Sequence, residues 1–366
     1  MERINWISNI RVFALVSVIF LHVGDPLFYE FSVPPSSFWW IGNIYDRIVR
    51  NCVPLFVMIT GALFLSRKIE LKYFFQKRFM RILVPFLFWS FIYVAREAFH
   101  LSWREGTNFL TNLWDLNFFA RLLKGDIMYH FWYVYMFIGL LLFIPILNKW
   151  IRNSNEKDIL YFLCIWLITI IIGYKFIGNH INDYLKLSYF SGFAGYLVLG
   201  YYLANAEKYK IGSLNINNLC AKIKDYKTLI SSKLLLTVLV LISFLITIFE
   251  TYYMSMRKGG LYMSDFYDYL TISVLMATIG IFLFIKSCKL SNKTFIKIIS
   301  FLDKYSYGIY LVHILTLICL KRFGIDAYFI HPLIGVPLVT ILCAGISAGI
   351  IFVINKIPVV GKYISG

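Results

Sequence analysis

Ten apolar stretches, each about as long as a membrane-spanning helix, follow one another along the chain and limit what it can fold into. A helix needs about 20 mainly apolar residues to cross the hydrocarbon core of a bilayer. Sixty per cent of the 366 residues are hydrophobic, which excludes an ordinary soluble domain. The sequence therefore predicts an all-α integral membrane protein with about ten transmembrane helices. The stretches lie near residues 5–23, 44–65, 80–100, 129–147, 158–176, 188–206, 233–252, 267–286, 304–320 and 331–355.

The basic residues predict which side of the membrane holds the ends of the chain. If the N-terminus, the C-terminus and every second loop (66–81, 148–158, 205–233 and 286–304) share one side, that side carries 24 of the 36 Lys and Arg. By the positive-inside rule, both termini are cytoplasmic. The net charge of +17 is spread over short loops, so we expect no nucleic-acid partner.

No second domain and no metal site are expected. The longest polar connections, 97–128 and 207–232, are too short for an enzyme domain. We therefore expect residues 1–366 to form a single polytopic domain without a soluble part. Its first span has no small-residue cleavage site after it and is expected to be retained. The six cysteines lack the spacing of metal ligands or of a disulfide framework.

Arg11 and His22 stand in the first span, eleven residues apart. A helix would place them on one face, separated by roughly 16 Å along its axis. An Arg at the centre of a membrane helix costs about 2.5–3.5 kcal/mol, which favours a functional reason for such groups. Asp25, three residues after His22, is a candidate to orient the imidazole. Gly24 and Pro26 predict that the helix ends near there.

Lys77, Arg78 and Arg81 end the first predicted cytoplasmic loop. Arg78 and Arg81 are three residues apart and would share a helix face, where two guanidinium groups suit a phosphate. The alternative is anchoring at the membrane surface under the positive-inside rule.

Arg47 and Arg50 open the second predicted span, with Asp46 and Asn51 beside them. They either line an opening on the external side that binds a polar acceptor, or they are interfacial residues whose charged ends reach water.

Pro54 and Gly61 in the second span predict a bend and a close approach of another helix. Gly192, Gly195 and Gly200 in the sixth span predict tight helix contacts as well.

Two further groups carry polar or aromatic side chains at the ends of spans. His130, Trp132 and Tyr133 open the fourth span and form either an interfacial aromatic belt or a platform on which an acceptor stacks. Ser306 and His313 lie on one side of the ninth span, within about 20°, where a histidine commonly joins two helices by a hydrogen bond.

In this order and spacing, the motifs resemble the acyltransferase-3 family of bacterial membrane acyltransferases, over essentially the whole chain. The shared features are Arg-x10-His in the first span, Pro-Leu-Phe and Thr-Gly in the second, Arg-x2-Arg before Leu-Val-Pro, Trp-Tyr in the fourth, the glycines of the sixth and Ser-Tyr-Gly-Ile-Tyr-Leu-Val-His in the ninth. The opening Ile-Asn-Trp-Ile-Ser-Asn-Ile-Arg is similar to short members that O-acetylate surface polysaccharides. Thr60 departs from the Ser of many relatives, and the extra esterase-like domain of some relatives is not expected.

The resemblance implies transfer of an acetyl group from acetyl-CoA, or of another acyl group from its acyl-CoA, to a hydroxyl group of a surface polysaccharide or lipid-linked glycan. The protein would lie in the bacterial inner membrane in contact with membrane lipids, and the glycan acceptor would bind at the extracytoplasmic face. Because the thioester is already activated, the reaction needs a base, an oxyanion site and fixed geometry. His22 is the predicted base and Asp25 its partner. Arg78, Arg81 and Lys77 are expected to bind the phosphates of CoA, with Arg11 at the tunnel opening or on a phosphate. The predicted acceptor-binding residues are Arg47, Arg50, His130, Trp132, Tyr133, Ser306, Tyr310 and His313.

Two other classes of protein stay open at this point. A transporter or flippase for a glycan or lipid-linked sugar would use Arg11 and His22 as proton-relay or substrate groups. It would not depend on CoA and would often show matched halves, which the sequence does not reveal. A structural subunit would tolerate loss of both side chains. A channel is disfavoured because no stretch of the sequence resembles a selectivity filter.

Overall fold

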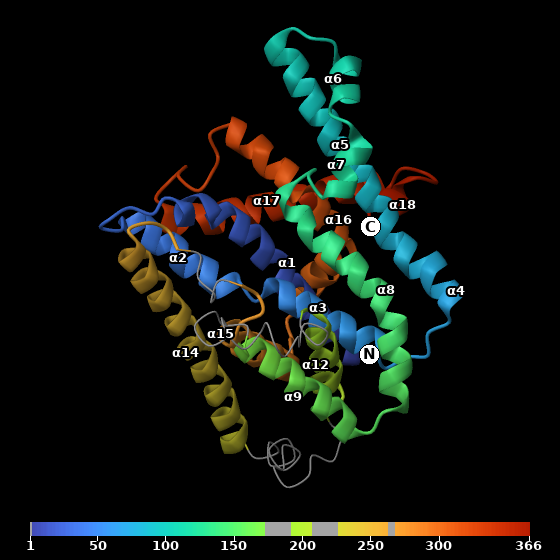
Figure 1. Ribbon diagram of the computed structural model, residues 1–366, viewed down its shortest axis with the longest axis vertical. Helices are drawn as coiled ribbons and strands as arrows, with labels where there is room; N and C mark the ends of the chain where they lie inside the picture. Colours follow the sequence, from blue (N-terminus) through green and yellow to red (C-terminus); the bar gives the residue numbers. More distant parts are fainter. Residues whose placement is uncertain (1, 173–191, 207–225, 263–267) are drawn as a thin grey trace. The chain divides into compact units, whose positions relative to one another are not determined.

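The computed structural model describes residues 2–172, 192–206, 226–262 and 268–366, and within these ranges every regular element is a helix (Figure 1). In chain order they are α1 (Glu2–Tyr29), α2 (Ser37–Val49), α3 (Cys52–Phe64), α4 (Leu71–Tyr73), η1 (Phe74–Phe79), α5 (Met80–Glu105), α6 (Phe109–Asp115), α7 (Phe118–Lys124), η2 (Tyr129–Phe131), α8 (Trp132–Asn153), α9 (Glu156–Ile172), α12 (Ala194–Ala204), α14 (Tyr226–Lys258), α15 (Ile272–Ser287), α16 (Lys293–Arg322), α17 (Pro332–Asn355) and α18 (Gly361–Ile364).

The predicted all-helical class is confirmed for the described residues, and each apolar stretch overlaps a helix. Parts of the stretches at 158–176 and 188–206, and of the loop at 205–233, lie outside the described residues. The number of crossings and the side of the termini remain predictions. Among the described residues, the helical segments long and apolar enough to cross a membrane are Trp6–Tyr29, Ser37–Phe64, Leu71–Glu105, Phe109–Asn153, Lys233–Lys258 and Pro332–Asn355.

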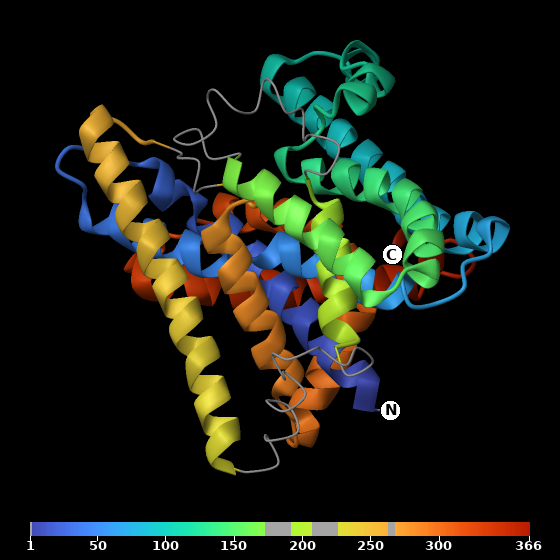
Figure 2. The ribbon, with the colours of Figure 1, turned by 60° about the horizontal axis from the view of Figure 1, so that its bottom comes forward.

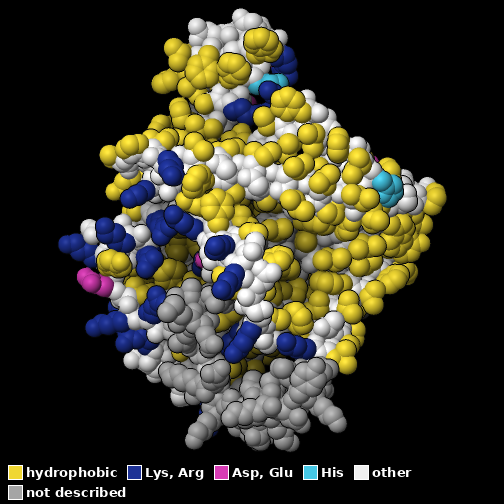
Figure 3. Space-filling model, turned by 180° about the vertical axis from the view of Figure 1, so that it is seen from behind, with side chains coloured by type: hydrophobic (Ala, Val, Ile, Leu, Met, Phe, Trp, Pro, Cys, Tyr) yellow, Lys and Arg dark blue, Asp and Glu magenta, His cyan; other side chains and the backbone are white. Residues whose placement is uncertain are grey.

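The exposed side chains of α14 are mainly apolar, as expected for a helix that contacts lipid. Leu234, Leu241, Leu245 and Phe249 are all more than half exposed. In water, such a continuous apolar patch would be a liability. Hydrophobic side chains also cover broad parts of the face seen in Figure 3. These exposed residues therefore support the membrane assignment.

The prediction that the first helix ends near Gly24 and Pro26 is wrong, because α1 continues to Tyr29. Pro26 removes only one donor from the backbone hydrogen bonds of the helix, the N–H group that would bond to the carbonyl group of His22. Leu27 and Phe28, the next two residues, are completely buried and hold the last turn against its neighbours. His22 and Asp25 are thus on continuous helix.

The second predicted span is two helices rather than one that starts at residue 44. α2 ends at Val49 and α3 begins at Cys52, with Arg50 and Asn51 between them. Pro54 explains the break, since its nitrogen has no hydrogen to donate to the carbonyl group of Arg50. The hydrogen bond from the Leu55 N–H to the Asn51 carbonyl group, 3.1 Å long, starts the new helix.

The predicted loop at 286–304 is also partly helical, because α16 begins at Lys293. The side-chain oxygen of Asn292 accepts hydrogen bonds from the N–H groups of Thr294 and Phe295, at 2.9 and 3.2 Å. Asn is a strong helix cap at this position. The helix therefore starts eleven residues before the apolar stretch that predicted it.

The chain divides into two compact units, and each is described by itself. Unit 1 comprises Met1–Lys68, Ile146–Asp303 and Asp326–Thr340, and unit 2 comprises Ile69–Pro145, Lys304–Ile325 and Ile341–Gly366. In unit 1, α1 packs on α2, α3 and α15, α3 packs on α12, and α14 lies beside α15 in both ribbon views (Figures 1 and 2). In unit 2, α5 packs on α6, α7 and α18.

Two glycines bring α3 and α12 of unit 1 into backbone contact. A Cβ atom on Gly61 would lie 1.9 Å from the carbonyl oxygen of Leu197, and one on Gly200 would lie 2.1 Å from that of Met58. Only glycine allows such an approach. The predicted close contacts are confirmed for these two positions, and also for Gly195, where a Cβ atom would lie 2.0 Å from the ring of Trp166. Gly192 is different: it precedes α12 with a φ of +93°, and a Cβ atom there would meet nothing within 4 Å.

Substitution of Gly61 or Gly200 by alanine should therefore destabilise the protein by about 1–3 kcal/mol, because α3 and α12 must separate. Gly345→Ala in α17 is the matched control, since a Cβ atom there meets nothing within 4 Å. That change should be neutral or stabilising by up to about 1 kcal/mol, the gain in helix propensity. Thermal unfolding of the purified protein in detergent measures both effects. Equal midpoints for Gly200→Ala and Gly345→Ala would contradict the tight contact.

Polar side chains close the ends of the apolar helices in unit 1. The amide group of the buried Asn148 donates to the carbonyl groups of Phe64, Leu65 and Arg67, at 2.9, 3.2 and 2.7 Å, where α3 ends. Lys286 donates to the carbonyl group of Leu203 at 2.8 Å, at the end of α12. These contacts satisfy carbonyl groups that a helix end leaves without partners.

Candidate functional site

His22 and Asp25 form a hydrogen-bonded pair on α1. The Nδ1 atom of His22 lies 2.9 Å from the Oδ2 atom of Asp25, and the two side chains are 11% and 20% exposed. If Nδ1 carries the hydrogen that Asp25 accepts, the imidazole lone pair is on Nε2. A partly buried imidazole oriented by a carboxylate in this way can act as a general base.

Arg11, one turn after Ser8 on α1, is paired with Asp303 of α16, a residue that the sequence did not single out. A guanidinium nitrogen of Arg11 donates to one carboxylate oxygen of Asp303, and the Ser8 hydroxyl group donates to the other at 2.8 Å. Both charged side chains are about three-quarters buried. This ion pair offsets much of the cost of placing Arg11 in an apolar helix.

Arg47 and Arg50 are buried within the candidate membrane span Ser37–Phe64, and are 2% and 6% exposed. They are therefore not interfacial residues whose ends reach water, and that alternative is wrong. The carboxylate group of Asp46 holds both, with Oδ2 3.5 Å from an Arg47 nitrogen and Oδ1 3.2 Å from an Arg50 nitrogen. The ring of Phe28 lies 5.2 Å from the Arg47 guanidinium carbon.

A second cluster lies in unit 2, around His130 of η2. Its ring centre is 5.1 Å from that of His313 on α16, and the hydroxyl group of Tyr310 donates to the His130 carbonyl group. His313 lies with its Nδ1 atom 2.5 Å from the carbonyl oxygen of Tyr310 on its own helix. Tyr133 is buried and contacts Tyr310 edge to face at 5.4 Å. The structure thus joins four predicted acceptor residues.

Two other predicted residues of unit 2 differ in burial. Ser306 of α16 is buried, whereas Trp132 at the start of α8 is 39% exposed. The position of Trp132 suits an interfacial belt better than a closed stacking platform.

Lys77, Arg78 and Arg81 are exposed at η1 and the start of α5 in unit 2. An Arg81 guanidinium nitrogen lies 3.5 Å from the Gly366 carbonyl oxygen. η1 is a short π-helical segment, a form that is rare and often found at functional sites. The three cations belong to a different unit from His22, so each group is considered within its own unit.

Tyr269 is another residue that sequence analysis did not single out. The guanidinium carbon of Arg50 lies 4.8 Å from its ring centre. No group of three His, Cys, Asp or Glu side chains suited to a metal ion occurs among the described residues.

Comparison with known proteins identifies the family of the chain. No curated protein and no solved structure matches the chain. The acyltransferase-3 family, described as an acyltransferase domain, matches residues 4–355. This match includes both units and all the candidate residues, and it favours an acyltransferase over the transporter alternative. With nearly its whole length matched, the chain belongs to the acyltransferase-3 family of membrane acyltransferases.

Proposed function

We propose that the protein is an O-acetyltransferase of the bacterial inner membrane, with ten crossing helices and both termini in the cytoplasm. It takes an acetyl group from cytoplasmic acetyl-CoA and transfers it to a hydroxyl group of a surface polysaccharide or lipid-linked glycan at the extracytoplasmic face. The observation that supports this proposal best is the 2.9 Å pair of His22 and Asp25 on α1, in a chain that belongs to an acyltransferase family.

In the proposed step, the acceptor hydroxyl group attacks the thioester carbonyl carbon while the Nε2 atom of His22 takes the hydroxyl proton. Asp25, on the Nδ1 side, stabilises the imidazolium. The tetrahedral intermediate collapses, the carbon–sulfur bond breaks, and the imidazolium returns its proton to the CoA thiolate. The products are an acetyl ester and free CoA. Positioned base catalysis of this kind typically contributes about 10²–10⁴-fold.

The donor's charges determine where it binds. The nucleotide and its phosphate groups cannot cross hydrocarbon, so they dock on the exposed cations of η1 and α5 while the pantetheine arm reaches inward. Arg78 and Arg81, with Lys77 beside them, are the proposed phosphate contacts. Arg11, held by Asp303, is proposed to stand at the opening through which the arm enters.

Replacing Arg78 and Arg81 together by alanine should raise the KM for acetyl-CoA about tenfold or more with little change in kcat, because charge-assisted phosphate contacts are lost. Added salt should weaken donor binding to the wild type more than to the double variant, since exposed charges are screened. Arg67→Ala, an exposed arginine in the same loop, is the control and should leave KM unchanged. An unchanged KM in the double variant would place the phosphates elsewhere.

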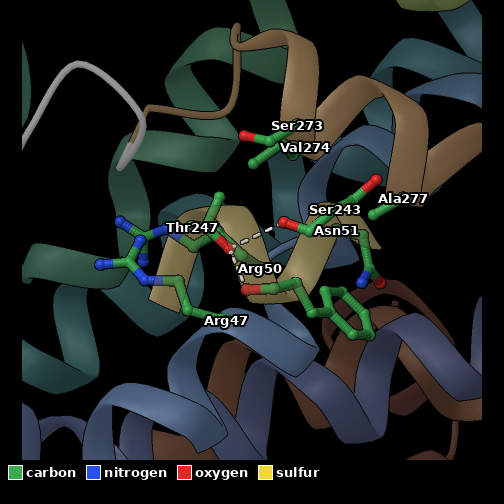
Figure 4. A pocket seen from close by; sticks show the side chains of 9 residues that line it. Arg47, Arg50, Asn51, Ser243, Thr247, Ser273, Val274 and Ala277 are labelled. Atoms are coloured by element: carbon green, nitrogen blue, oxygen red, sulfur yellow. Dashed lines mark hydrogen bonds between the residues drawn. The ribbon is translucent and has the colours of Figure 1, made fainter. Parts of the chain in front are cut away.

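Arg47 and Arg50, beside α14 and α15 (Figure 4), are the proposed acceptor contacts of unit 1. Within unit 2, the proposed acceptor residues are the His130 cluster (His130, Tyr133, Tyr310 and His313), Ser306 and Trp132.

The proposal is tested by purified protein in proteoliposomes given radiolabelled acetyl-CoA and an extract of surface glycans. Label should appear in glycan as an ester that alkali removes, and free CoA should be released in equal amount. Hydrolysis of acetyl-CoA without labelled glycan, or no label with any thioester donor in a folded preparation, would contradict an O-acetyltransferase.

A further inference from the structure

The segment Gly361–Gly366 lies in a closely packed junction of unit 2, against α5 and α16. It contains α18, which packs on α5 (Figure 1). Ser365 is completely buried. The Nε1 atom of Trp89 on α5 donates to the Ile364 carbonyl group at 3.0 Å, and the Asn355 amide group donates to the Ser365 hydroxyl group at 2.7 Å. These contacts make the segment an internal part of unit 2.

Gly308 on α16 makes room for this segment. A Cβ atom on Gly308 would lie 2.1 Å from the carbonyl oxygen of Ser365 and 2.9 Å from a side-chain carbon of Ile351. One on Gly366, whose φ is +93°, would lie 3.0 Å from the Gly308 nitrogen. Any larger residue at position 308 would therefore displace the segment.

The same junction reaches the turn of α5 that carries Arg81. A guanidinium nitrogen of Arg81 lies 3.5 Å from the Gly366 carbonyl oxygen. The hydroxyl group of Tyr307, the residue before Gly308, donates to the Ile82 carbonyl group at 2.8 Å. The segment and α16 thus contact both a side chain and the backbone of this turn.

This turn of α5 is weakly supported by its own helix. Pro85 has no N–H group to donate to the carbonyl group of Arg81, the bond that an α-helix would make there. On its other side lies the π-helical segment η1, whose hydrogen-bond pattern differs from that of α5. Arg78 lies in η1 and Arg81 in the first turn of α5, and both are exposed. The contacts from Tyr307 and Gly366 replace part of the missing support.

We propose that Tyr307, Gly308 and the segment Gly361–Gly366 form a brace that positions Arg78 and Arg81 for the phosphate groups of CoA. The donor's part in this inference rests on the proposed function, whereas the contacts do not. The brace acts through the arginines and does not itself touch the donor. Guanidinium groups that are already held in place lose less conformational entropy when they bind a phosphate. A loosened brace should therefore weaken donor binding without slowing the chemical step.

The brace is measured first without CoA, by hydrogen exchange of the purified full-length protein in detergent. In Gly308→Ala the new Cβ atom must push the Ser365 carbonyl group away, so the amide hydrogens of residues 81–84 should exchange at least tenfold faster than in the wild type. Tyr307→Phe removes only the hydroxyl group and should have a smaller effect in the same direction. Gly349→Ala on α17 is the matched control, because a Cβ atom there meets nothing within 4 Å. Equal exchange in all four proteins would overturn the brace.

The affinity for CoA is then measured by calorimetry on the same proteins. Gly308→Ala and Tyr307→Phe should each bind CoA at least threefold more weakly than the wild type, and the KM for acetyl-CoA should rise with little change in kcat. Gly308→Ala added to Arg78→Ala/Arg81→Ala should cause no further loss, since both changes act on the same phosphate contacts. A merely structural role would lower the unfolding temperature and leave the affinity for CoA unchanged.

Unchanged CoA binding in folded Gly308→Ala and Tyr307→Phe proteins would overturn the positioning role alone and leave the proposed function standing. Tighter binding would overturn it as well, and would show that the Gly366 carbonyl group competes with phosphate for Arg81. If Gly308→Ala does not fold, Tyr307→Phe decides. A wild type that binds no CoA would contradict the proposed function itself, and the donor role of the brace with it.

Discussion

Replacing His22 by alanine should lower kcat for acetyl transfer by about 10²–10⁴-fold, the usual contribution of a positioned general base. The KM for acetyl-CoA should change little, because the imidazole acts on the acceptor hydroxyl group rather than on the nucleotide. The rate is measured as labelled glycan ester formed in proteoliposomes. Added imidazole should restore part of the rate in His22→Ala, since the small base can occupy the space left by the side chain. A folded His22→Ala protein with the wild-type rate would exclude this residue as the base.

Asp25 provides the control that separates orientation from proton transfer. Asp25→Asn should reduce kcat by about 10–10²-fold, because the amide no longer stabilises the imidazolium. The double variant His22→Ala/Asp25→Asn should be no slower than His22→Ala alone, since residues that act as a unit give non-additive losses. Multiplied losses in the double variant would instead show that Asp25 acts independently of His22.

Local sequence patterns were sufficient to predict the His22–Asp25 pair and the glycine contacts. Residues three apart on a helix are neighbours in any tertiary structure, and the 2.9 Å contact agrees. Gly61 and Gly200 could be predicted as sites of close packing because only small residues allow it. Where α1 ends could not be predicted, because the burial of Leu27 and Phe28 outweighs the helix-breaking tendency of Pro26.

Contacts between distant segments were beyond the reach of the sequence. Asp303 is 292 positions from Arg11, and no spacing rule connects them. Arg47 and Arg50 could be read as either a ligand site or interfacial residues until α14 and α15 were seen to enclose them. Tyr269 is one of 26 tyrosines, and only its place beside Arg50 distinguishes it.

Removal of either partner of the Arg11–Asp303 pair should lower the free energy of unfolding by about 2–3 kcal/mol. Breaking a fully buried ion pair typically costs about 3–5 kcal/mol, and these side chains remain 26% and 20% exposed. Ser8 retains its hydrogen bond to Asp303 in Arg11→Ala, but the hydroxyl group cannot replace a positive charge. Arg11→Ala and Asp303→Ala should therefore unfold at lower temperature than the wild type, and the double variant should lose less than the sum of the two.

The same variants decide whether Arg11 only stabilises the fold or also contacts the donor. If its role is structural, Arg11→Ala/Asp303→Ala should recover both stability and the KM for acetyl-CoA. If Arg11 stands at the donor's opening, as proposed, the double variant should recover stability while its KM stays at least tenfold above that of the wild type. Asp303→Asn, which keeps the shape of the side chain, should then lower stability with a much smaller effect on KM. Recovery of KM in the double variant would remove Arg11 from the donor site and leave Arg78 and Arg81 as the proposed phosphate contacts.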